Sequence, residues 1–152
     1  MNHYSDENRG KFQNVAQAKQ IISYEGMLFE GRSGVRNVTP TDIDGFIQLE
    51  VQDTFIFIET KHHGNLPKGQ EDSLERLSDV LYRRAGNEVI VIVTEHSTPQ
   101  ENTVLLRDTA VKKYLHRGEW HIVDTHISCL SFIEQYIEYL NKRIFLYNSN
   151  YT

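Results

Sequence analysis

Two strand-like runs follow each other between residues 43 and 60, and they restrict the fold more than any other part of the chain. The second run, residues 54–60, is apolar on both faces, which is typical of a central strand covered on both sides of a sheet. The first run, residues 43–51, alternates apolar and polar residues in part. Only Gln52 and Asp53 separate the runs, so the sequence predicts a tight antiparallel hairpin.

A two-residue turn fixes which residues of this hairpin face each other. Asp44 is then opposite Lys61, and Phe46 is opposite Glu59. Side chains two residues apart share a face of a strand, so we expect Asp44, Glu59 and Lys61 on one face of the sheet. The two carboxylates can hold a divalent cation there, and the lysine can orient or activate a water molecule near it.

The same residues resemble the PD-(D/E)xK nuclease superfamily, whose members include many restriction endonucleases, archaeal Holliday-junction resolvases and RecB-type exonucleases. The resemblance rests on Asp44, on Glu59-Thr60-Lys61 at the end of an apolar strand and on the helix that follows, within residues 15–94. It implies a restriction-endonuclease-like αβββαβ core that hydrolyses DNA phosphodiester bonds with Mg²⁺ or Mn²⁺. It also implies that Asp44, Glu59 and the carbonyl group of Thr60 bind the metal, while Lys61 positions the attacking water.

Glu25 is a further candidate metal ligand. A helix is predicted over residues 14–29, and Glu25 lies on its apolar stripe, where an acid must be paired, protonated or bound to a metal. Members of the superfamily often place a glutamate on this helix beside the metal. In the alternative interpretation the stripe is wide, and Glu25 reaches solvent at its edge.

Gln70 and Asp42 are the other candidates near the site. Gln70 opens a predicted helix over residues 70–85 and matches a glutamine of exonuclease-like members, but Leu74 stands where an aromatic residue commonly follows in them. A solvent-exposed glutamine explains the same position. Asp42 has the same parity as Asp44, which is preferred because it lies deeper in the hairpin.

Basic residues in three places are candidate contacts to nucleic-acid phosphates, although solvated surface side chains explain them as well. They are Arg32 and Arg36 in a polar loop, Lys68 before the helix, and Lys112 and Lys113 in the one basic concentration of the sequence. Tyr114 and Trp120 lie near that concentration and are candidates for stacking on bases. An edge hairpin with a buried tryptophan is the alternative interpretation.

Two adjacent histidines, His62 and His63, follow the Glu-x-Lys strand. Neighbouring residues at the end of a strand point to opposite faces. We therefore expect these histidines to contact substrate or to lie on the surface, and not to share one metal ion.

The rest of the chain predicts elements around the first hairpin. Three leucines, at 74, 77 and 81, give the helix over residues 70–85 a buried stripe, and residues 88–94 form a buried strand beside the Glu-x-Lys strand. A second hairpin turns near residues 117–118. A last helix is predicted over residues 128–145, with core positions Leu130, Ile133, Ile137, Leu140 and Ile144. The order predicts an α/β fold in three layers, with a mixed β-sheet flanked by helices.

Length and composition limit the class of protein. The 152 residues suffice for a single domain, and residues 1–12 are expected to be flexible. We expect no membrane segment and no signal peptide, and a lone cysteine, Cys129, excludes an internal disulfide. These features favour a cytoplasmic protein in which Cys129 packs as a small hydrophobe in the last helix.

The net charge of −5 argues against strong nonspecific binding to nucleic acid, and two alternatives to a nuclease stay open. One is a nuclease-like module that no longer cleaves but binds nucleic acid or a protein. The other is a small interaction protein in which Asp44 and Lys61 form a cross-strand ion pair. DNA is the expected partner of a nuclease, and the sequence leaves open a protein partner that supplies specificity and a homodimer.

Overall fold

Five strands form one mixed sheet in the computed structural model, which describes residues 43–50, 53–63 and 65–149, the last of these ranges with backbone only from residue 144. The strands are β1 (Gly45–Leu49), β2 (Thr54–Lys61), β3 (Val89–Glu95), β4 (Ala110–His116) and β5 (Glu119–Ile122). Their order across the sheet is their order in the chain. β2 and β3 are parallel, and the other neighbours are antiparallel. The α/β class and the mixed sheet are therefore confirmed.

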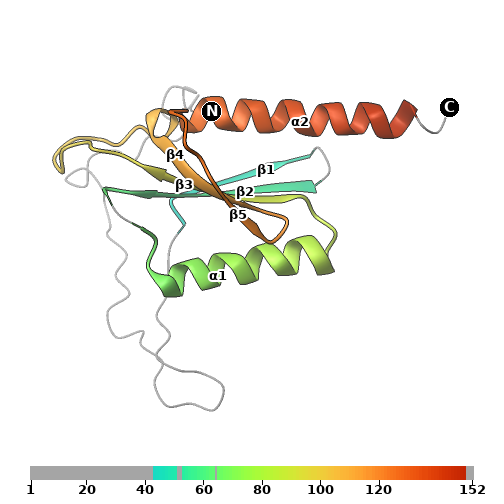
Figure 1. Ribbon diagram of the computed structural model, residues 1–152, viewed down its shortest axis with the longest axis horizontal. Helices are drawn as coiled ribbons and strands as arrows, with labels where there is room; N and C mark the ends of the chain where they lie inside the picture. The colour runs from blue at the N-terminus through green and yellow to red at the C-terminus, as the bar shows by residue number, and fades with distance from the viewer. Residues whose placement is uncertain (1–42, 51–52, 64, 150–152) are drawn as a thin grey trace, which may run out of the picture. The chain divides into compact units, whose positions relative to one another are not determined.

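Two helices cover opposite faces of the sheet (Figure 1). α1 (Lys68–Asp79) connects β2 to β3, and α2 (Cys129–Ser149) follows β5. A 3₁₀ turn, η5 (Leu106–Asp108), precedes β4. All of these elements belong to one compact unit made of residues 42–97 and 104–152. Neither helix in the described part of the chain meets the length and hydrophobicity that crossing a bilayer demands.

Alternate side chains of β2 and β3 pack in two separate cores, one on each side of the sheet, which explains why both strands are apolar on both faces. Towards α2, Ile56, Ile58, Ile90 and Ile92 pack with Cys129, Tyr136 and Leu140. Towards α1, Phe57, Val89, Val91 and Val93 pack with Leu74. The central pair of strands is thus held from both sides, and the polar ends of these strands are the places where the apolar pattern stops.

The helix predicted over residues 70–85 is confirmed, with a start two residues earlier. Leu74 is buried, and Leu77 and Leu81 pack partly buried against the same core. The helix continues as a single π-helical turn, η4 (Val80–Arg84), in which the N–H of Ala85 donates to the carbonyl of Val80 at 3.2 Å. Gly86 follows with a φ of 75°, as expected of a residue that ends a helix.

The first hairpin is confirmed, but its predicted register is wrong by two residues. Gly45 pairs with Ile58 and Leu49 pairs with Thr54, so residues 50–53 connect the strands. Asp53 has a φ of 46°, and its N–H donates to the carbonyl of Glu50 at 3.3 Å. A two-residue turn needs positive φ angles that Asn and Gly adopt most readily, and Gln52-Asp53 lacks a glycine, so the chain uses a longer turn.

The last helix is confirmed, with Leu140 buried and Ile133 packed against the core as predicted, but the predicted core position Leu130 is wrong. Cys129, Tyr136 and Leu140 are buried, whereas Leu130 is 37% exposed. Cys129 therefore packs as a small hydrophobe, as predicted, and burial raises the pKa of its thiol to about 11.

The second hairpin is also confirmed, with positive φ angles at Arg117 and Gly118. Residues 1–12, which were expected to be flexible, and the helix predicted over residues 14–29 lie outside the described residues.

Candidate active site

The carboxyl end of β2 carries the Glu-x-Lys residues, and Asp44 lies beside them just before β1. The register that pairs Gly45 with Ile58 places Asp44 next to Glu59 when it is continued by one residue. The backbone N–H of Thr60 donates a hydrogen bond of 2.8 Å to Oδ2 of Asp44. The side chain of Asp44 is thereby held against the end of β2.

Glu59 is almost completely buried, with 1% of its side chain exposed. Its Cα partner on β3 is Val93, so the carboxylate lies within the apolar face that packs towards α1. Lys61 is two residues further along the same face, and its Nζ lies 3.5 Å from Oε2 of Glu59. A buried carboxylate is costly unless charged or hydrogen-bonding groups compensate it, and Lys61 supplies such a charge.

The observed register gives Asp44 other neighbours than the predicted one. The ladder between β1 and β2 ends at the pair of Gly45 and Ile58, and Asp44 lies in a bend just before it. Glu59 and Lys61 are two residues apart on β2 and share the face towards α1. Asp44 reaches β2 through its side chain, which accepts from the N–H of Thr60, and its predicted place on the face of Glu59 and Lys61 stays a prediction.

Glu95 is a charged residue just beyond the strand that the sequence predicts over residues 88–94. The structure makes it the last residue of β3, where its Cα partner is Lys61. A β-bulge in β4, opposite Val93 and Thr94, leaves Lys112 as an extra residue, and its Nζ lies 3.9 Å from Oε1 of Glu95. Because β2 and β3 are parallel, their carboxyl ends meet at one edge of the sheet. A prediction of that parallel pairing would have placed Glu95 beside Lys61.

Three histidines lie next to these strand ends. The rings of His62 and His63 have centroids 4.6 Å apart, and the ring of His96, which follows β3, has its centroid 5.1 Å from that of His62. The N–H of His96 donates to the carbonyl of Lys61 at 3.0 Å, which continues the pairing of β2 with β3. Burial lowers the pKa of His96, the charges of His62 and His63 lower it further, and the charge of Asp44 opposes them.

Adjacent histidines were expected to point to opposite faces, and this expectation is wrong. β2 ends at Lys61, and His63 has a φ of 65°, in the left-handed region. The two rings lie in contact just after the end of β2. Sequence reasoning missed His96 as a neighbour of the pair because it lies more than thirty residues further along the chain.

Comparison with protein-family models, with curated proteins and with solved structures found no match to this chain.

The metal ligands predicted at Asp44, Glu59 and Thr60 would be two carboxylates and one backbone carbonyl, a set of the kind that Mg²⁺ takes. Within the ranges that the structure describes, no group of three or more His, Cys, Asp or Glu side chains is placed to hold a metal ion. His62, His63 and His96 therefore do not form such a group either. Mg²⁺ commonly binds through one or two carboxylates and keeps several waters. The carbonyl of Thr60 points to the same edge of β2 as its N–H, which is the edge beside Asp44.

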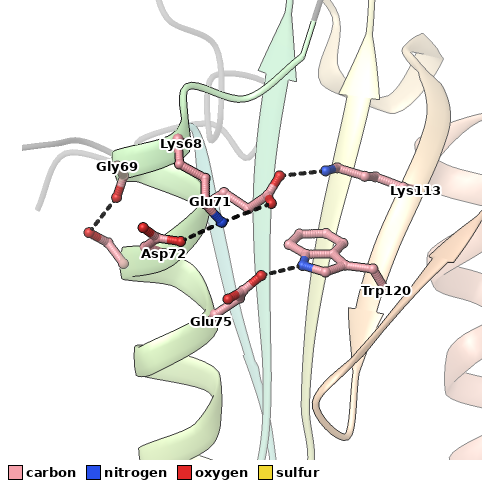
Figure 2. A network of polar contacts seen from close by, with 8 residues as sticks. Lys68, Gly69, Glu71, Asp72, Glu75, Lys113 and Trp120 are labelled. Atoms are coloured by element: carbon pink, nitrogen blue, oxygen red, sulfur yellow. Dashed lines mark hydrogen bonds and ion pairs between the residues drawn. The ribbon is translucent and has the colours of Figure 1, made fainter.

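Lys113 is tied to α1, as Figure 2 shows. Its Nζ lies 2.7 Å from Oε2 of Glu71 and 4.3 Å from the centroid of the Trp120 ring. The indole N–H of Trp120 donates to Oε1 of Glu75 at 2.7 Å. These contacts join β4 and β5 to α1. Lys113 is only 18% exposed, so its position gives no support to the predicted contact with nucleic acid.

The other predicted site residues are not drawn into the cluster by any contact within the described ranges. Lys68 is exposed and pairs with Asp72 at 2.7 Å, also drawn in Figure 2, and Lys112 is exposed beside Glu95. Gln70 lies half-buried in the first turn of α1. Their roles stay predictions. Glu25, Arg32, Arg36 and Asp42 lie outside the described residues.

Proposed function

We propose that this protein is a metal-dependent nuclease with a restriction-endonuclease-like core, which hydrolyses DNA phosphodiester bonds with Mg²⁺ or Mn²⁺. The burial of Glu59 carries the proposal. A buried ion pair contributes little to stability, because replacing it with apolar side chains is often neutral or stabilising. A buried carboxylate that lies with a lysine and a second carboxylate at the ends of two strands is better explained by chemistry.

The three charged side chains have separable roles in this proposal. Asp44 and Glu59, with the carbonyl of Thr60, hold the metal, which when bound polarises the phosphate and lowers the pKa of a water ligand. Glu59 fixes the ammonium group of Lys61 at 3.5 Å, and about a quarter of the Lys61 side chain reaches solvent. Lys61 can therefore donate hydrogen bonds to an attacking water and to a phosphate oxygen on which negative charge develops.

The first test is cleavage of linear, circular and single-stranded DNA by the full chain with Mg²⁺ or Mn²⁺. We expect metal-dependent cleavage that EDTA abolishes. Lys61→Ala and Glu59→Gln should each lower the rate by about 10²-fold or more, because each removes a group that acts on charge in the transition state. Lys142→Ala and Glu138→Gln, at exposed positions of α2, are the matched controls and should cleave like the wild type.

A second readout separates metal binding from cleavage. Mn²⁺ should raise the midpoint of thermal unfolding of the wild type, because a ligand that binds only the folded state stabilises it. The shift should vanish in Glu59→Gln and persist in Lys61→Ala. Cleavage by a correctly folded Lys61→Ala variant at the wild-type rate would contradict the role of Lys61. DNA binding without cleavage on any substrate would favour the inactive nucleic-acid-binding module instead.

A further inference from the structure

The histidine cluster, His62, His63 and His96, is built from two loops that leave neighbouring parallel strands. His62 and His63 follow β2, and His96 follows β3. Their rings contact each other edge to face, with interplanar angles of 71° and 70°. Ligands of open α/β sheets commonly bind beyond the carboxyl ends of the strands. The cluster therefore occupies a place where a substrate of the proposed active site is expected to lie.

His62 and His63 place their rings at the surface. Both residues are exposed, so the contact between their rings lies within reach of solvent. His63 has a φ of 65°, a backbone conformation that histidine adopts more readily than most residues with a side chain. Exposed imidazole rings that lie together beside a candidate active site point to a ligand for those rings.

The chemistry of the rings identifies the class of ligand. The described residues contain no metal-holding group, so a metal shared by these histidines is not supported. Each imidazole keeps at least one N–H donor in every protonation state. Three such donors in a cluster suit a group with several acceptor oxygens, and phosphate contacts from side-chain donors are what position a nucleic acid on a protein.

We propose that His62, His63 and His96 together bind a phosphate group of the nucleic-acid substrate, beside the bond that is cleaved at Asp44, Glu59 and Lys61. The identity of the substrate rests on the proposed nuclease function. The N–H of His96 donates to the carbonyl of Lys61 at 3.0 Å, and Lys61 directly precedes His62 in the chain, so the cluster adjoins the candidate active site. The histidines bind substrate, and the carboxylates and the lysine act on the reacting phosphate.

The test uses the full chain with His62→Ala, His96→Ala and His63→Asn, singly and combined. Asparagine adopts positive φ angles more readily than most residues, so His63→Asn removes the ring and keeps the turn. Binding of a fluorescein-labelled oligonucleotide in EDTA reports affinity without cleavage. We expect the triple variant to bind about tenfold or more weakly, and KM for cleavage to rise similarly while kcat changes little. His121→Ala is the control, since His121 stacks on Tyr114, which packs in the core towards α2.

Inorganic phosphate provides a readout that does not depend on cleavage. In NMR spectra of the wild type, it should shift the imidazole resonances of His62, His63 and His96 and leave those of His121 in place. Such shifts without cleavage of any DNA would support the phosphate site and contradict the nuclease. Metal-dependent cleavage with unchanged oligonucleotide binding and unchanged KM in the folded triple variant would overturn the histidine proposal and leave the nuclease standing.

Discussion

At Gly118 the backbone has a φ of 83°, directly after Arg117 with a φ of 54°. Two successive positive φ angles form the kind of turn that matches the twist of a two-residue hairpin, here between β4 and β5. A Cβ at position 118 would meet only the end of the Arg83 side chain, at 3.6 Å, so the backbone angle is the main cost of a substitution. We expect Gly118→Ala to lower the free energy of unfolding by about 1 kcal/mol, measured by urea denaturation.

Gly69 gives the matched control at the residue scale. It lies in the first turn of α1, and a Cβ there would meet nothing within 4 Å. Gly69→Ala should leave the free energy of unfolding unchanged or raise it by up to about 1 kcal/mol, because alanine restricts the unfolded chain and favours a helix. A loss of stability in both variants would contradict an explanation based on backbone angles.

At the scale of elements, the ion pair between Lys113 and Glu71 should fix the position of α1 on the sheet. Both side chains are about one-fifth exposed and their charged atoms are 2.7 Å apart. A double-mutant cycle with Lys113→Met and Glu71→Gln should give a coupling free energy of about 1 kcal/mol or more, because solvent screens this pair incompletely. Unfolding by urea measures each corner of the cycle.

Lys68 and Asp72 form the comparison pair on the same helix. Their charged atoms are also 2.7 Å apart, but both side chains are exposed. Their cycle should show coupling that is indistinguishable from zero in physiological salt. Equal coupling in the two cycles would show that distance alone, and not burial, sets the strength of the contact.

The elements themselves could be predicted from the sequence more fully than their exact alignment. Apolar runs and leucine spacing identified β2, β3 and α1, because those signals are local. The hairpin register depends on the length of the turn. The prediction assumed a two-residue turn, whereas residues 50–53 connect the strands. In α2, Leu140 and Ile133 pack in the core as predicted, but Leu130 is 37% exposed while Cys129 and Tyr136 are buried, because apolar spacing alone does not distinguish these neighbouring positions.

The candidate site was predictable only where its residues lie close in the chain. Asp44, Glu59 and Lys61 belong to one hairpin, so they lie near one strand end even with the wrong register, and Asp44 contacts β2 at the N–H of Thr60. Glu95 and His96 join the same edge through the parallel pairing of β2 with β3. His63 joins His62 through a backbone angle, and residue type alone does not specify that angle.

At the scale of the whole molecule, Glu88 connects three elements. It precedes β3, and its carboxylate contacts His116 at the end of β4, Arg117 in the following turn at 3.4 Å and Arg143 of α2 at 3.2 Å. Burial alone would raise the pKa of Glu88, but the hydrogen bond from His116 and the charge of Arg117 outweigh it and lower the pKa from 4.5 to about 2.

This pKa shift predicts a loss of stability in acid. A carboxyl group whose pKa is lower in the folded state stabilises the fold above its unfolded pKa, and the stabilisation disappears as the pH falls from 4.5 towards 2. The shift corresponds to a contribution on the order of 3 kcal/mol. Urea unfolding at pH 7 and pH 3 should show a smaller difference for Glu88→Gln than for the wild type.

Exposed Glu134 on α2 provides the control for that experiment. Glu134→Gln should keep the pH dependence of the wild type. At pH 7, Glu88→Gln should be the less stable variant, because it leaves three cationic or hydrogen-bonding partners without their shared carboxylate. An unchanged pH dependence in Glu88→Gln would assign the acid sensitivity to other carboxyl groups.

The strands of the sheet pair in the order in which they are synthesised, and this has a consequence for how fast the described unit forms. Each strand meets a partner that is its immediate predecessor, so no distant segment has to be brought back to complete the sheet. The widest closure is the one between β2 and β3, which α1 bridges. Chains with such local pairing lose little entropy before contacts form, so this sheet belongs among the faster-folding mixed α/β topologies.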